Sequence, residues 1–165
     1  MSEEIPIVNE QDQIIGYKER DAVAKEDIYR VSALWVTNSQ GQILLAQRAF
    51  TKHHHPGKWG PAVAGTVEKG ETYKQNIIKE AEEEIGLKNI RPQNSKKVRV
   101  TPATGNHNHF TQWYTLVIDK PIDDFVVRKE EVAQVKWFKP DELKDDLTAH
   151  PDHYLPNLSW NLQNL

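Results

Sequence analysis

Three glutamates at helical spacing carry the clearest chemical signal in this sequence. Glu80, Glu83 and Glu84 lie in a segment rich in helix formers that ends at Gly86. On an α-helix these three side chains fall within an arc of about 100°, whereas Glu82 points away from it. Like charges at this spacing repel each other, and a bound cation would remove that repulsion. Clustered carboxylates are ligands that Mg²⁺ and Mn²⁺ prefer.

An exposed acidic face is the alternative explanation of this cluster, because charge runs on helices are usually solvated. The surrounding residues favour a site. Gly65 and Glu71 precede the expected helix, and Gly86 stands where a helix C-terminus often needs a left-handed residue. These positions have no obvious part in a solvated helix face, so the whole segment is a candidate site.

The segment from Gly65 to Leu87 resembles the Nudix box, whose pattern is G-x5-E-x7-R-E-U-x-E-E-x-G-U with U apolar. The glycine, glutamate and apolar positions match, with Ala81 in the first apolar position. The departure is Lys79, where the family has arginine. The resemblance implies an α/β fold of the Nudix type, an α/β/α sandwich with a mixed β-sheet. It also implies hydrolysis of a phosphoanhydride bond in a nucleoside diphosphate derivative or a similar organic pyrophosphate.

A metal cofactor, Mg²⁺ or Mn²⁺, follows from the same resemblance. The metal ligands that it indicates are Glu80, Glu83, Glu84 and the carbonyl oxygen of Gly65. We expect Glu83 and Glu84 to be ligands and Glu80 to be either a ligand or the general base. A bound metal would neutralise the polyanionic substrate, orient its phosphates and lower the pKa of a coordinated water.

Four residues of the segment are expected to take part in catalysis, namely Glu80, Glu83, Glu71 and Lys79. Glu71 and Lys79 would orient the site through an ion pair. Lysine offers a point charge without the planar fork of arginine, so the geometry around Lys79 and its effect on the rate are open questions. The identity of the general base is open as well.

Charged residues outside the box are candidates for substrate contacts. Arg48 and Lys52 lie beside a Pro/Gly loop and could grip substrate phosphates, with ordinary loop charge as the alternative. Glu131 precedes an expected strand and is a candidate auxiliary acid, with a surface charge as the alternative. The run His53–His55 is expected to be a surface loop with at most one substrate contact, because consecutive residues cannot easily converge on one ion.

Two other functions are alternatives to the hydrolase. Residues outside the box also resemble the type 1 isopentenyl-diphosphate isomerases, which use a cysteine, a glutamate and a histidine-rich metal site. In that alignment Ala64 stands at the cysteine position, and Thr66 and Tyr29 stand at positions of metal-binding histidines. The chain contains no cysteine, which argues against the isomerase. The other alternative is a non-catalytic nucleotide-binding module, which only Lys79 supports.

The pattern of apolar residues predicts the elements that position these side chains. A helix is expected over 72–85, with Thr72 and Gln75 at capping-box spacing. Further helices are expected from Pro140 and near Leu158. The expected strands cover residues 5–8, 14–17, 29–36, 43–47, 61–64, 98–101, 110–118 and 132–138. We expect one Nudix domain over 1–165, in which 1–28 form a hairpin and a lead-in segment.

Composition limits the class of protein. The chain has 165 residues with a formal net charge of −3, so no strong overall field attracts nucleic acid or membranes. It shows neither a signal-peptide pattern nor an apolar stretch of the ~20 residues that a membrane helix needs. We therefore expect a cytoplasmic protein whose partner is a small-molecule pyrophosphate. The exact substrate and the oligomeric state are open, with a homodimer among the options.

Overall fold

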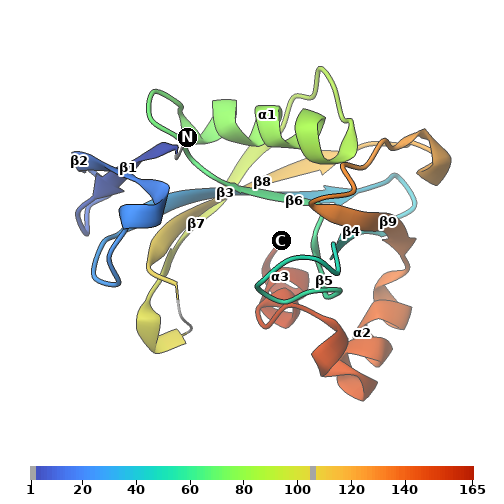
Figure 1. The fold of residues 1–165 in the computed structure, drawn as a ribbon. Helices are drawn as coiled ribbons and strands as arrows, with labels where there is room; N and C mark the ends of the chain where they lie inside the picture. Colours follow the sequence, from blue (N-terminus) through green and yellow to red (C-terminus); the bar gives the residue numbers. More distant parts are fainter. Residues whose placement is uncertain (1–2, 105–106) are drawn as a thin grey trace.

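A mixed β-sheet with helices on both faces forms the centre of the molecule (Figure 1). The computed structural model describes residues 3–104 and 107–165. The strands are β1 (Glu4–Val8), β2 (Ile14–Glu19), β3 (Tyr29–Thr37), β4 (Ile43–Arg48), β5 (Trp59–Pro61), β6 (Val63–Thr66), β7 (Gln93–Val100), β8 (His109–Val117) and β9 (Val132–Phe138). The helices are α1 (Tyr73–Ile85), α2 (Pro140–Ala149) and α3 (Leu158–Asn164), with short 3₁₀ turns between elements. This arrangement confirms the expected α/β class.

The sheet opens between β3 and β4. These strands pair only at their closed end, where Val36 faces Leu44 and Thr37 faces Ile43. Beyond that point they separate, so that β6 pairs with β3 while β5 pairs with β4. On its other edge β3 pairs in parallel with β8, and β4 pairs with β9. The separation leaves room for a pocket between the two halves of the sheet.

Two apolar cores lie on opposite faces of the sheet, because successive side chains of a strand point to opposite faces. Along β3, Leu34 and Val36 join α1 in one core. Trp35 joins Leu143 of α2 and Leu158 of α3 in the other. No helix of residues 3–104 and 107–165 has the length and apolarity needed to cross a membrane.

Local signals determine where α1 begins and ends. The Thr72 side chain accepts a hydrogen bond from the Gln75 N–H, and the Gln75 side chain accepts one from Thr72, which completes the expected capping box. Gly86 ends the helix at φ 71°, a left-handed conformation that glycine adopts readily. The buried positions Ile77, Ala81 and Ile85 hold the helix against the sheet, so its two ends and its packed face are defined.

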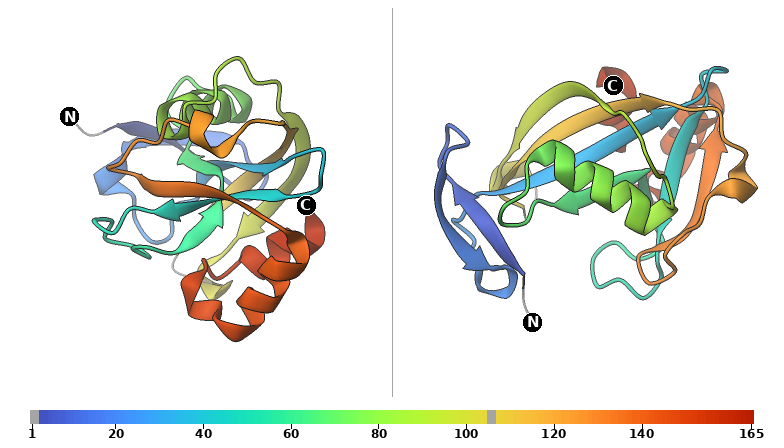
Figure 2. Two further views of the ribbon diagram at one scale, coloured as in Figure 1. Left: turned by 90° about the vertical axis from the view of Figure 1, so that its right-hand side faces the viewer. Right: turned by 90° about the horizontal axis from the view of Figure 1, so that it is seen from above.

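An N-terminal hairpin, β1–β2, lies beside the start of α1 (Figure 2). Asp12 in its turn has φ 58° and a side chain that is only 9% exposed. That carboxylate accepts hydrogen bonds from Arg30 Nε at 2.7 Å, Lys97 Nζ at 2.6 Å and the Tyr73 hydroxyl at 2.9 Å. The contacts tie the hairpin to β3, β7 and α1.

The prediction of one strand over 61–64 was wrong. Two strands occupy this region, with Ala62 between them, and the second continues past Gly65 to Thr66. They pair with different partners because β3 and β4 diverge. β7 also begins at Gln93 rather than near Val98, since its first residues are polar and exposed and give no apolar alternation.

Candidate active site

A pocket of about 610 Å³ occupies the opening of the sheet. Its walls come from α1, β4, β5 and β6, from the N-terminal segment and from the chain that leads into β9. Figure 2 shows the N-terminal hairpin near the start of α1 and the β9 lead-in near the other end of that helix. The charged residues that line the pocket are Glu3, Arg20, Arg48, Lys52, Glu80, Glu83, Glu84, Arg128 and Glu131.

The glutamates of α1 divide as helical rotation predicts. Glu80, Glu83 and Glu84 line the pocket, whereas the exposed Glu82 does not. Burial raises the pKa of Glu84 to about 9, and the negative charges of Glu80 and Glu131 contribute to this rise. Burial also raises the pKa of Glu80, against the opposing effect of the Lys79 charge. A cation in the pocket would favour the charged forms of both carboxylates.

Gly65 allows the Glu80 side chain to lie directly against the backbone of β6. A Cβ atom at Gly65 would lie 2.6 Å from Cγ and 2.8 Å from Cδ of Glu80, far inside normal contact distances. Any larger residue would therefore push the Glu80 carboxylate away from this strand. The glycine brings its own main chain and a carboxylate to one point of the pocket.

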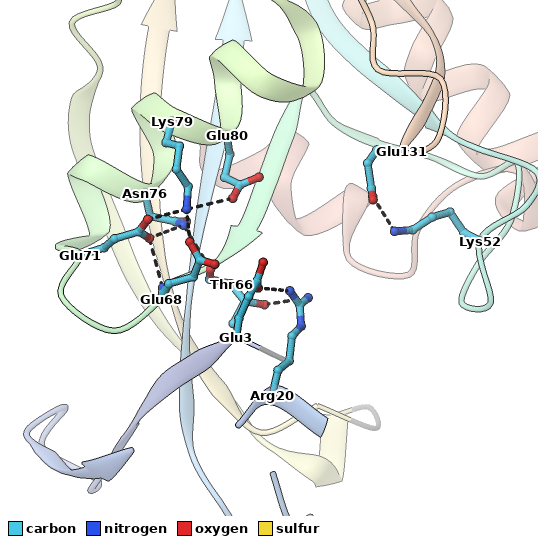
Figure 3. Close-up of polar contacts among 10 residues, drawn as sticks. All are labelled: Glu3, Arg20, Lys52, Thr66, Glu68, Glu71, Asn76, Lys79, Glu80 and Glu131. Carbon is cyan, nitrogen blue, oxygen red and sulfur yellow. Dashed lines mark hydrogen bonds and ion pairs between the residues drawn. The ribbon is translucent and has the colours of Figure 1, made fainter. Parts of the chain in front are cut away.

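Lys79 lies between the carboxylates of Glu68, Glu71 and Glu80, as Figure 3 shows. Its ammonium group forms ion pairs with Glu71, as expected, and also with Glu68. Its distance to Glu80 Oε1 is 3.8 Å. Burial opposes the charge on Lys79, but hydrogen bonds to Glu68 and Glu71 outweigh it and raise the lysine's pKa. The ammonium is therefore permanently charged at neutral pH.

Asn76 supports the same group from the buried side of α1. Its amide nitrogen donates to Glu71 Oε2 at 2.9 Å and to the Thr66 carbonyl at 3.1 Å. Its amide oxygen accepts from the Ser32 hydroxyl at 2.5 Å. These bonds link α1 to β3 and β6 and hold the Glu71 carboxylate in place.

Cations gather on the walls that face the acidic helix. Lys52 Nζ lies 2.5 Å from Glu131 Oε2, so the two predicted residues meet across the pocket mouth. The Ala49 N–H donates to the Glu131 carbonyl at 3.0 Å and ties the two segments together. Arg48 Nε donates to the His54 carbonyl at 2.9 Å. Among the described residues, none of His53–His55 lines the pocket.

The donor set fits a hard divalent cation. Carboxylates at partly buried positions and the raised pKa values of Glu80 and Glu84 are features that such an ion satisfies. As they stand, the side chains of residues 3–104 and 107–165 form no group of three or more His, Asp or Glu close enough to hold an ion together. The glutamates share one pocket without converging on one point.

Several residues in or beside the pocket were not predicted from the sequence. Glu68 and Asn76 belong to the box segment but fall at its unspecified positions, so only the contacts reveal them. Glu3 and Arg128 approach the pocket from outside the box. Arg20 also lines the pocket and was not predicted from the sequence. The sequence holds no local signal for these long-range approaches.

Comparisons with known proteins agree with this geometry. The NUDIX domain family matches residues 28–158. An uncharacterized Nudix hydrolase of Yersinia pestis is 27% identical over 93% of this chain and 80% of its own length. An isopentenyl-diphosphate Delta-isomerase of Aliivibrio fischeri is 24% identical over 93% of this chain and 90% of its own. The crystal structure of DR0079 from Deinococcus radiodurans superimposes with a TM-score of 0.80 at 24% identity, covering 98% of both chains.

Proposed function

This chain belongs to the Nudix family, and we propose that it is a metal-dependent hydrolase of phosphoanhydride bonds in nucleoside diphosphate derivatives or similar organic pyrophosphates. The observation that carries the proposal is the division of charge in one pocket. Glu80, Glu83 and Glu84 line one wall, and four cationic side chains line the others. A polyanionic substrate that arrives with a divalent ion suits both kinds of wall.

Mg²⁺ or Mn²⁺ would be held by Glu83, Glu84 and the Gly65 carbonyl, and when bound it would supply charge neutralisation and an acidified water. Glu80 is a further ligand or the general base that accepts a proton from the attacking water. Lys79 and Glu71 hold the Glu80 side of α1 in position by their ion pair. The helix α1 would thus hold the carboxylates that bind the metal and the carboxylate that accepts a proton on one rigid element.

Arg48 and Lys52 are proposed to bind the substrate phosphates. Both line the pocket, and Lys52 can exchange its ion pair with Glu131 for a phosphate oxygen. This exchange would free the Glu131 carboxylate beside Glu84, where it can serve as an auxiliary acid. Phosphate binding and the availability of Glu131 are therefore coupled.

The isomerase is the second candidate because relatives with that name match nearly the whole chain. Ala64 and Thr66 both line the pocket, so the positions of the isomerase cysteine and of one metal-binding histidine carry a methyl group and a hydroxyl here. With no cysteine in the sequence, the proton transfers at carbon lack one of the two side chains that the isomerases use. We therefore favour hydrolysis.

A substrate panel tests the proposal. The purified protein is incubated with nucleoside di- and triphosphates, nucleotide sugars, dinucleoside polyphosphates and isoprenoid diphosphates, with Mg²⁺, Mn²⁺ or EDTA. We expect release of phosphate or nucleotide products from at least one compound, and none with EDTA. If no compound gives product, the nucleotide-binding module would be favoured. Conversion of isopentenyl to dimethylallyl diphosphate would favour the isomerase.

A further inference from the structure

The N-terminal segment reaches the pocket although it lies outside the matched residues 28–158. Arg20 follows β2 in a short 3₁₀ turn, and Glu3 precedes β1. The Arg20 N–H donates to the Glu3 carbonyl at 2.7 Å, which joins the two ends of the hairpin. The side chains of both residues line the pocket beside β6. The hairpin therefore forms part of the pocket wall.

The Arg20 guanidinium has room for further acceptors. Its Nη1 lies 3.2 Å from Glu3 Oε2, and its Nη2 donates to Thr66 Oγ1 at 3.4 Å (Figure 3). Both contacts are long for charge-assisted hydrogen bonds, and the side chains of Arg20 and Glu3 are 55% and 51% exposed. Thr66 follows Gly65, so the guanidinium lies one residue from the strand position that abuts Glu80.

We propose that Arg20 binds a terminal phosphate of the substrate, and that Glu3 competes for the guanidinium until substrate arrives. The ligand chemistry is that of a diphosphate group, which a guanidinium can bind with two parallel hydrogen bonds. This inference rests on the proposed function. It adds a substrate contact from the hairpin, on the side of the pocket near β6, to the contacts of Arg48 and Lys52 near β4.

Because Glu3 competes with the substrate for Arg20, substitutions of these two residues should change diphosphate affinity in opposite directions. An exposed ion pair is weak and exchanges readily, so a diphosphate can replace Glu3 as the partner of Arg20. Removal of the Glu3 charge should free Arg20 and strengthen diphosphate binding, whereas removal of the Arg20 charge should weaken it. If Glu3 acts only through Arg20, its substitution should have no effect once Arg20 has been replaced.

Neighbouring Glu4 offers a matched control. Its carboxylate pairs with Lys69 at 2.9 Å, with both side chains about half exposed, but neither residue lines the pocket. Glu3→Gln and Glu4→Gln therefore remove the same charge from adjacent positions in equally exposed ion pairs. A general electrostatic effect would change the pyrophosphate affinity of both variants equally. Competition for Arg20 would change the affinity of Glu3→Gln alone.

The experiment measures binding of inorganic pyrophosphate to the full chain by calorimetry, with and without Mg²⁺, for wild type, Arg20→Gln, Arg20→Lys, Glu3→Gln, Glu4→Gln and the double variant Glu3→Gln/Arg20→Gln. We expect Arg20→Gln to raise Kd about tenfold, a change of about 1.4 kcal/mol. Arg20→Lys should fall between wild type and Arg20→Gln. Glu3→Gln should lower Kd about threefold, Glu4→Gln should match wild type, and the double variant should match Arg20→Gln. Melting temperatures confirm that each variant is folded.

Several results would overturn the inference. They are wild-type affinity in folded Arg20→Gln, equal effects of Glu3→Gln and Glu4→Gln, and no binding of pyrophosphate to the wild type at millimolar concentration. Failure of the proposed function is a separate result, because it is read from the substrate panel. A protein that binds pyrophosphate through Arg20 without turnover would retain this site and lose the hydrolase assignment.

Discussion

The carboxylates of Asp12 and Glu84 are both largely buried, and they lie near opposite ends of α1. Asp12 contacts Tyr73, the first residue of α1, and Glu84 lies in the last turn. Burial opposes ionisation of Asp12, but hydrogen bonds from Lys97, Arg30 and Tyr73 outweigh burial and lower its pKa. For Glu84 burial acts together with neighbouring negative charge, and its pKa rises to about 9.

The difference separates a carboxylate that holds the fold together from one that we propose as a metal ligand. Asp12 has its full complement of donors within the chain, so its charge stabilises the folded state. Glu84 faces a pocket in which other carboxylates are its neighbours, so burial and these neighbours disfavour its charged form, which a bound cation would favour. Removing each charge should therefore have opposite effects on stability, and only one removal should affect catalysis.

The largest expected effect is the loss of turnover in Glu84→Gln and Glu83→Gln. Each substitution removes a carboxylate that we propose as a metal ligand, and kcat should fall by ~10²-fold or more. In EDTA, Glu84→Gln should also raise the free energy of unfolding by about 1 kcal/mol, because it removes a carboxyl whose ionisation the folded state disfavours. The measurements are kcat, metal titration and urea unfolding.

Glu82→Gln is the matched control for these variants, since it removes the same charge from a residue that does not line the pocket. Its rate should match wild type, and its stability should change by no more than about 0.5 kcal/mol. A rate loss in Glu82→Gln as large as that in Glu83→Gln would contradict the assignment of the acidic wall.

Asp12→Asn should have the second-largest effect, on stability rather than on rate. The substitution leaves Arg30 and Lys97 beside a neutral amide, and the free energy of unfolding should fall by about 2–3 kcal/mol. The kcat of the folded protein should stay within about twofold of wild type. Urea unfolding measures the first quantity, with the exposed Asp21→Asn as a control that changes stability by at most about 0.5 kcal/mol.

The stability that the Asp12 carboxylate contributes should depend on pH. The pKa of Asp12 is lower in the folded state than its usual value of 3.8, so the unfolded chain takes up the proton first as pH falls. The stabilisation is fully present above about pH 5 and is lost as pH falls below about 4 toward the folded-state pKa. The stability difference between wild type and Asp12→Asn should be constant from pH 5 to 7 and shrink in acid, and a constant difference down to about pH 2.5 would argue against the ion pairs.

Lys79 should give the smallest of these effects. Lys79→Gln removes the charge shared by Glu68 and Glu71, and kcat should fall about tenfold as the Glu80 side of α1 loses its nearest cation. Lys79→Arg keeps that charge and should stay within about threefold of wild type. The measurement is kcat with metal titration. Equal losses in both variants would mean that the site needs a compact ammonium rather than positive charge alone.

Features with local signals were predictable from the sequence. The cap at Thr72, the apolar stripe and Gly86 specify α1 within a few residues, and the rotation of that helix places Glu80, Glu83 and Glu84 on the pocket side. The strand expected over 132–138 coincides with β9, because its seven residues are rich in β-branched and aromatic strand formers.

Features that depend on distant partners were not predictable. Near Ala62 the local sequence does not distinguish one bent strand from two short ones. Two strands form because β3 and β4 diverge and each pairs with a different one. Asn76 is buried because Ser32 and Thr66, far away in the sequence, satisfy its amide. The approach of Arg20 likewise depends on how the hairpin packs beside β6, which no local pattern encodes.

The parallel pairing of β3 with β8 has a consequence for the order of assembly during synthesis. Tyr29 pairs with His109, so the whole segment that contains α1 must be made before this edge of β3 finds its partner. β4 must wait longer, until β9 has been made. Gly65 and α1 are close in sequence and need no such delay. The helix α1 and the cations Arg20, Arg48 and Lys52 are therefore all made early, but the sheet that positions them is completed only after β8 and β9 have been made.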